Sequence, residues 1–198
     1  LLNDSAHKAL IFTSCDHTDL AKRPNLDVEY YDNYPATIDT LNIQLNAEDG
    51  FDAYMGYLNP NNNMGQQPDL MALAWTCSGD PCGGRGLFGF YLYWIPDTAS
   101  IASAKLNLYQ NYTSSNAGGS HQTISGDNDG FLSRVTEPWD ENIVTWNTAP
   151  AFTTEGQVYL PPSDSAHEDY MDIDITNFIR YWHANPNKNY GMNLRLYT

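Results

Sequence analysis

Alternation of apolar and polar residues along the chain predicts a series of short β-strands. Residues 41–45, 105–108 and 192–196 alternate cleanly, so each stretch places apolar side chains on one face and polar side chains on the other. Clusters of Asn, Gly, Ser and Pro, which are typical of turns, separate the alternating stretches. The pattern therefore predicts an all-β fold built from half-buried strands.

Two stretches depart from this alternation. The stretch from Phe88 to Ile95 is nearly continuous in aromatic and apolar residues, which predicts a central strand covered on both faces. From Thr176 onward, apolar residues recur every three or four positions until Pro186, which predicts one short helix that closes an end of the fold. Further strands are expected around Val135 and over residues 143–146 and 172–175.

Composition and charge exclude several classes of function. The 198 residues include 24 Asp and Glu against nine Lys and Arg, a formal net charge of −15, so a nucleic-acid backbone would be repelled. No apolar run approaches the roughly 20 residues of a membrane-spanning helix. Motifs of serine hydrolases, zinc proteases and phosphate-binding loops are absent from the sequence. Asp172 and Asp174 share one strand face, but solvent exposure explains them more simply than glycoside hydrolysis does. We therefore expect a non-catalytic protein.

The three cysteines predict one disulfide. Cys77 and Cys82 flank Ser-Gly-Asp-Pro, a turn-forming stretch that favours a disulfide over free thiols, with metal ligation the weaker alternative. Cys15 is then either a buried thiol or a cross-link to another chain. A disulfide predicts an extracellular or cell-surface location. Because the chain begins at Leu1, we expect a processed or excised product.

A long motif in the C-terminal half resembles a known family. Residues 134–150 are similar to the R-V-T-x-x-W-x-E-x-x-V-T-W-N-x-x-P stretch of DNRLRE-type domains, which are grouped with disaggregatase-related repeats and carbohydrate-binding module family 96. Residues 85–88 and 189–195 support the resemblance. It implies a secreted, non-catalytic, jelly-roll-like β-sandwich of two antiparallel sheets, often found beside polysaccharide-active enzymes or in surface proteins. Within the motif, we expect Trp139 and Trp146 to pack between the two sheets rather than to form a platform on which sugars stack.

The order of the chain departs from the order of that family. Residues 11–16 and 23–30 resemble the last two strands of such a domain, its F-x-S and R-P-x-L-x-V-x-Y pieces, yet here they come first. We therefore divide the chain into a displaced closing strand pair over 1–31, a linker over 32–40 and a sandwich body over 41–198.

The displaced pair carries a set of alternating apolar residues that the body would otherwise lack. These residues are Leu10, Phe12, Leu26, Val28 and Tyr30. Their burial is worth on the order of 10 kcal/mol before entropy is counted, which is comparable with the whole net stability of a domain, about 5 to 15 kcal/mol. The body is therefore not expected to be stable alone.

Three arrangements would supply the missing strands. The pair can fold back on its own body as a permuted monomer, or it can close the adjacent repeat of a tandem array. It can also insert into the next copy, head to tail, and build a filament by donor-strand complementation. We favour the filament or the tandem fibre, because both explain the unusual order as an assembly device.

A carbohydrate-binding module is the alternative to this structural subunit. Tyr54, Tyr57 and Trp75, beside the Asn-rich stretch 61–63, are candidate glycan contacts, because aromatic faces stack on sugar rings and amides bind hydroxyl groups. The resemblance implies an anionic algal polysaccharide as the ligand of relatives. The acidic composition instead favours a neutral glycan, unless calcium bridges protein and ligand.

Calcium is the one cofactor that the sequence suggests. Asp127 and Asp129, in an Asp-Asn-Asp-Gly stretch, supply hard oxygen ligands at alternate positions. The stretch lacks the distal Glu of a hand-type calcium loop, and a plain solvated turn explains it more simply. Calcium binding by Asp127 and Asp129 is therefore an expectation of the sequence.

Overall fold

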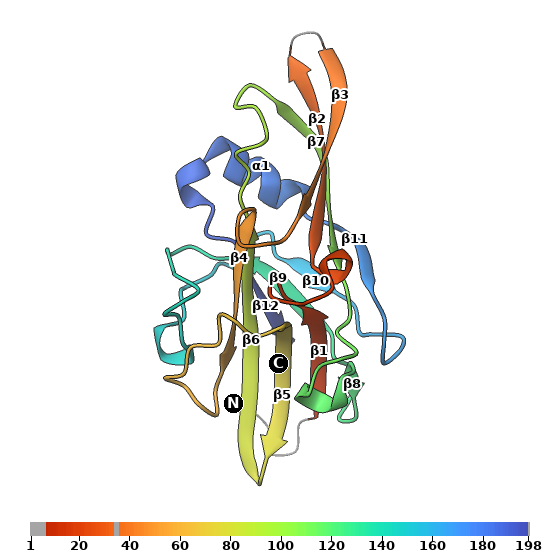
Figure 1. Ribbon diagram of the computed structural model, residues 1–198, viewed down its shortest axis with the longest axis vertical. Helices are drawn as coiled ribbons and strands as arrows, with labels where there is room; N and C mark the ends of the chain where they lie inside the picture. Colours follow the sequence, from red (N-terminus) through yellow and green to blue (C-terminus); the bar gives the residue numbers. More distant parts are fainter. Residues whose placement is uncertain (1–6, 34–35, 198) are drawn as a thin grey trace.

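The computed structural model describes residues 7–33 and 36–197, which form two antiparallel sheets and one α-helix (Figure 1). The strands are β1 (Lys8–Thr13), β2 (Asn25–Asn33), β3 (Ala36–Gln44), β4 (Gly50–Gly56), β5 (Asp69–Cys77), β6 (Asp80–Phe90), β7 (Ser100–Leu108), β8 (Gln122–Thr123), β9 (Gly130–Arg134), β10 (Val158–Leu160), β11 (Tyr170–Asp174) and β12 (Met192–Leu196). Sheet A has the order β10-β9-β12-β6-β5-β1-β8, with β4 also paired to β6, and sheet B has the order β11-β7-β2-β3. The predicted β-sandwich is confirmed.

The main core lies between the two sheets. Along β6, Phe88 and Phe90 point into this core, while Leu87 belongs to a second apolar cluster on the outer face of sheet A. Helix α1 (Thr176–Ala184) packs against β7 and adds Phe178 and Trp182 to the main core. The single helix predicted from the apolar spacing is therefore confirmed. No helix in the described ranges is long and apolar enough to cross a membrane.

The N-terminal strand pair is built into both sheets of its own chain. Strand β1 lies between β5 and β8, with Phe12 opposite Leu70, and β2 lies between β7 and β3, with Leu26 opposite Leu106. All five predicted closing residues lie in or against the core: Leu10, Phe12, Leu26 and Val28 without exposed surface, and Tyr30 packed beside them. The structure therefore shows that the N-terminal strands complete the sandwich of their own chain, the first of the three arrangements.

Most of the stretch predicted as a linker, residues 32–40, belongs to strands. Strand β2 runs to Asn33 and β3 starts at Ala36, so the two strands form one long antiparallel ladder. Pairing satisfies backbone donors and acceptors that an extended linker would leave to water. This β2–β3 arm projects from one end of the molecule (Figure 1), and Tyr31 and Ile38, which face each other across it, are exposed. The division of the chain after residues 31 and 40 into closing pair, linker and body stays a prediction.

The family-like motif over 134–150 crosses the outer face of sheet A. Trp139 and Trp146 pack there against residues of β4 and β6, so the expectation that they lie between the sheets is wrong. The strand predicted over 143–146 is also wrong. A 3-10 turn begins at Trp146, because the side chain of Thr145 caps its backbone. Apolar residues are needed in this motif because sheet A buries both of its faces.

Closure within one chain predicts a monomer. We expect the 198-residue chain to have a mass near 22.2 kDa by light scattering at all concentrations tested, because β1 and β2 already have partners. Removal of residues 1–31 should expose the core and the edges of both sheets and cause aggregation or unfolding. Long, uniform threads of the intact chain would contradict this prediction and support strand exchange between copies.

Candidate functional site

An aromatic groove lies where the motif over 134–150 meets the ends of β4 and β6. It has a volume of about 430 Å³. Its lining residues are Phe51, Tyr91, Pro138, Trp139, Asp140, Glu141, Asn142, Asn189 and Tyr190. The groove therefore combines four aromatic side chains with carboxylates and amides.

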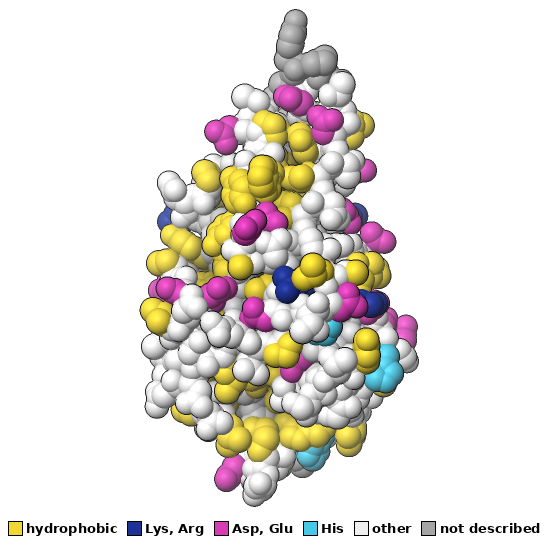
Figure 2. Space-filling model, viewed as in Figure 1, with side chains coloured by type: hydrophobic (Ala, Val, Ile, Leu, Met, Phe, Trp, Pro, Cys, Tyr) yellow, Lys and Arg dark blue, Asp and Glu magenta, His cyan; other side chains and the backbone are white. Residues whose placement is uncertain are grey.

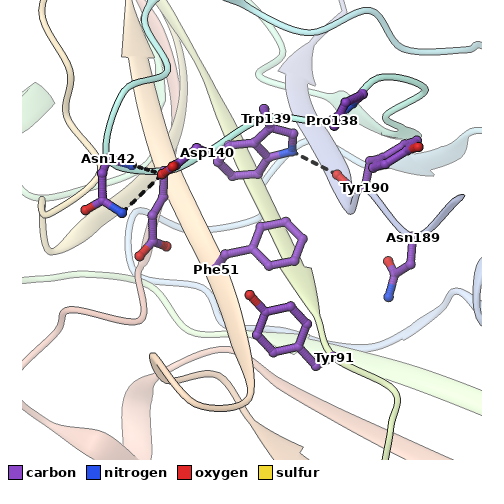
Figure 3. Close-up of a pocket in the computed structure, with 9 residues that line it drawn as sticks. Phe51, Tyr91, Pro138, Trp139, Asp140, Asn142, Asn189 and Tyr190 are labelled. Atoms are coloured by element: carbon purple, nitrogen blue, oxygen red, sulfur yellow. Dashed lines mark hydrogen bonds between the residues drawn. The ribbon is translucent and has the colours of Figure 1, made fainter. Parts of the chain in front are cut away.

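Three aromatic rings form the centre of the groove. The ring centroid of Phe51 lies 5.1 Å from that of Trp139 and 5.4 Å from that of Tyr91. Figure 3 shows the three rings in a column, with Asp140 and Asn142 on one side of it. Phe51 and Trp139 meet edge to face, with 72° between their planes, so the column offers apolar ring surfaces of different orientation to the C–H faces of sugars.

Polar groups flank the column on both sides. The Asp140 carboxylate accepts hydrogen bonds from the backbone and the side chain of Asn142, at 2.8 and 3.1 Å. On the opposite side, the Asn189 side chain donates to the carbonyl of Phe90 at 2.9 Å. The Oδ1 atom of Asn189 is buried and has no hydrogen-bond partner in the described part of the chain. The groove wall thus offers exposed carboxylate and amide acceptors at Asp140 and Asn142, whereas Oδ1 of Asn189 is enclosed.

The turn before β12 fixes one wall of the groove. Gly191 has φ +73°, a left-handed conformation that favours glycine, and a Cβ atom there would lie only 2.4 Å from the carbonyl oxygen of Phe88. Glycine therefore lets residues 189–190 pass close to β6. The indole Nε1 of Trp139 donates to the carbonyl of Tyr190 at 2.9 Å and ties the motif to this turn.

The strand predicted from Phe88 to Ile95 ends at Phe90, and the residues after it turn outward. Tyr91, Tyr93 and Trp94 are exposed, whereas Ile95 returns to the core. The expectation of a strand covered on both faces is therefore wrong over its second half. Hydrophobic side chains gather on the upper half of the face shown in Figure 2, over the loop that joins β6 to β7 and beside the β2–β3 arm.

A buried acidic cluster lies beneath the groove. The side chain of Asp52, on β4, is almost completely buried and accepts a 2.5 Å hydrogen bond from the backbone N–H of Cys15. The backbone N–H of Asp52 in turn donates to the carboxylate of Glu141, which lines the groove. The loop after β1 is thereby connected to the groove through two hydrogen bonds.

Burial determines the protonation of this cluster. Loss of water raises the pKa of Asp52 from 3.8 to about 7; the Asp16 and Glu141 charges add to the rise, and hydrogen bonds from Cys15 oppose it. Burial also raises the pKa of Glu141 and, far above its ordinary value, that of Cys15. The Cys15 thiol therefore stays protonated and unreactive, as expected for the buried alternative.

The structure does not bring the predicted glycan contacts together. Tyr54 is buried and lies in a separate hollow of about 450 Å³, which Asn62 also lines. Tyr57 is exposed and stands edge-on to Trp146, with ring centroids 5.6 Å apart. Trp75 is half-buried and stands edge-on to an imidazole ring at the N-terminal end of the described chain. Their contact with a glycan stays a prediction.

The structure joins Cys77 and Cys82 in a disulfide at the turn between β5 and β6, with the Cα atoms 5.7 Å apart. The Ser-Gly-Asp-Pro spacing was thus sufficient to predict the pairing. Ser78, with φ 55°, and Gly79, with φ 96°, supply the left-handed backbone of this turn.

The two carboxylates proposed for calcium lie apart from the groove. Asp127 is exposed, and Asp129 accepts a hydrogen bond from the hydroxyl of Tyr159 at 3.1 Å. Asn128, between them, is buried and donates to the carbonyl of Ala9, so the stretch anchors the end of β1. A group of three metal-capable side chains occurs elsewhere among the described residues, formed by Cys15, Asp16 and Asp52. Calcium binding at the predicted residues stays a prediction.

Comparison with known proteins identifies the family of the chain. No curated protein and no solved structure matches the chain. The sequence model of carbohydrate-binding module family 96 matches residues 44–197, well over half of the chain. The chain belongs to carbohydrate-binding module family 96. All the groove residues of this module lie within the matched range, while β1 and β2 precede it.

The acidic cluster beneath the groove predicts a pH-dependent stability. Because the pKa of Asp52 is raised in the folded module, its contribution to the free energy of unfolding is complete below about pH 4 and is lost as the pH rises to 7. Asp52→Asn, which stays neutral, should therefore gain melting temperature relative to the wild type between pH 4 and 8.

Thermal unfolding across this pH range measures the effect. Asp97→Asn, which changes an exposed carboxylate in a loop, provides the control. A difference between Asp52→Asn and the wild type that is independent of pH would show that Asp52 does not titrate in this way.

Proposed function

We propose that this module is non-catalytic and binds a polysaccharide in the aromatic groove. The observation that carries the proposal is the column of Trp139, Phe51 and Tyr91 beside amide and carboxylate acceptors. Aromatic faces remove the apolar side of a sugar ring from water, while the acceptors bind its hydroxyl groups. Membership in a family of carbohydrate-binding modules supports this assignment.

We also propose an extracellular or cell-surface location. The Cys77–Cys82 disulfide supports it, because such bonds persist in oxidising compartments. A reduced pair of thiols in protein isolated from its source would contradict it. Filament formation is not part of the proposal, because β1 and β2 already pair within their own chain.

Substitution in the groove tests the function. Tyr91 lines the groove and is partly exposed, so Tyr91→Ala should fold normally and weaken binding at least about tenfold, which corresponds to about 1.4 kcal/mol. Affinity electrophoresis in gels that contain xylan, galactomannan, mixed-linkage β-glucan or alginate measures the loss.

Tyr112→Ala is the matched control, because this tyrosine is exposed on a loop and does not line the groove. It should migrate like the wild type in every gel. The proposal would be contradicted if none of the four polysaccharides retarded the wild-type module, or if Tyr91→Ala and the wild type were retarded equally.

A further inference from the structure

The column of aromatic rings continues beyond the groove. Tyr93 lies beyond Tyr91, with ring centroids 6.2 Å apart, and Trp94 lies 4.8 Å from Tyr93. The exposed fractions of Tyr93 and Trp94 are 60% and 58%. Two large aromatic side chains so exposed side by side are unusual unless they bind something.

The rings are arranged in a continuous but turning series. The ring planes of Phe51 and Tyr91 differ by 47°, those of Tyr91 and Tyr93 by 32°, and those of Tyr93 and Trp94 by 48°. The ring faces therefore do not form one flat platform. A flat platform is the arrangement that would suit the surface of a crystalline polymer. A single chain that twists along its length can present successive sugar units to them.

Hydrogen bonds hold the two exposed rings in place. The indole Nε1 of Trp94 donates to Asp49 Oδ1 at 3.1 Å, and the hydroxyl of Tyr93 donates to the same oxygen at 3.4 Å and to the carbonyl of Glu48 at 2.9 Å. Asn46 donates to the other carboxylate oxygen of Asp49 at 2.6 Å. Asp49 is thus a positioning residue. Rings fixed before binding lose less conformational entropy when a ligand arrives.

The charges around the series select the class of ligand. Carboxylates of Asp49, Asp140 and Glu141 lie along it, and no Lys or Arg is among the residues that line the groove. Carboxylates accept hydrogen bonds from sugar hydroxyl groups but repel the carboxylates and sulfates of acidic sugars.

We propose that the site extends from the groove across Tyr93 and Trp94 and binds internal stretches of a single, neutral polysaccharide chain. This inference rests on the proposed function and adds the length and charge of the ligand. Several sugar units would be needed to fill the site, so affinity should increase with the length of the oligosaccharide.

Isothermal titration calorimetry with matched oligosaccharides tests the inference. The probes are the disaccharides and hexasaccharides of the cello-, xylo-, manno- and laminari- series, with alginate hexasaccharide as the acidic comparison. At least one neutral hexasaccharide should bind about tenfold or more tightly than its disaccharide. Trp94→Ala should reduce the affinity for that hexasaccharide about tenfold, Trp94→Phe should retain most of it, and Tyr112→Ala should leave it unchanged.

Asp49→Ala gives a second measurement that keeps both rings. It should weaken hexasaccharide binding severalfold, because Tyr93 and Trp94 lose their shared acceptor. Near-ultraviolet circular dichroism should show the loss of fixed orientation at these rings, with the melting transition retained. Unchanged affinity in this variant would contradict the positioning role.

The outcomes separate this inference from the proposed function. Equal affinity for disaccharide and hexasaccharide, or full hexasaccharide affinity in Trp94→Ala, would overturn the extended site and leave binding in the groove intact. Tighter binding of alginate hexasaccharide than of every neutral probe would overturn the assignment of a neutral ligand. Absence of binding to all nine probes would contradict the proposed function itself.

Discussion

Insertion of the N-terminal strands into both sheets is the constraint on which this structure depends. Strands β1 and β2 occupy interior positions, so the removal of either would open the core and leave neighbouring strands unpaired. The loop that follows β1 also supports the groove. The backbone N–H of Cys15 donates a hydrogen bond to the carboxylate of Asp52, and the backbone N–H of Asp52 donates one to the carboxylate of Glu141. The N-terminal segment therefore both closes the fold and supports the binding surface. It does so although β1 and β2 precede residues 44–197, the range that the family model matches.

Much of the fold could be predicted because local patterns determine it. Alternation placed strands at 105–108 and 192–196, and apolar spacing placed α1, since each pattern matches the period of its element. The β2–β3 arm was missed over 32–40. The described side chains over 32 and 37–40 are half-buried or exposed, so they give no buried apolar pattern, and the pairing that makes this stretch a strand is formed with residues of the same hairpin.

The groove could not be predicted in the same way. An aromatic run such as 88–95 has the same composition whether its residues fill a core or face a ligand, and only the end of β6 at Phe90 separates the two cases. Trp139 lies far from Phe51 in the sequence, and only the packing of its segment on sheet A brings the two rings together. The available signal was a Tyr-x-Tyr-Trp stretch over 91–94, two positions before Pro96, because a strand is expected to end near a proline.

The position of a bound glycan tests the account most directly. The five tryptophans give separate indole N–H signals in a nitrogen-15 correlation spectrum, which can be followed while the tightest-binding neutral hexasaccharide is added. A glycan bound along the aromatic series moves the signals of Trp94 and Trp139, while that of the buried Trp182 stays in place. Movement at Trp75, with no change at Trp94 and Trp139, would place the ligand elsewhere and contradict the account.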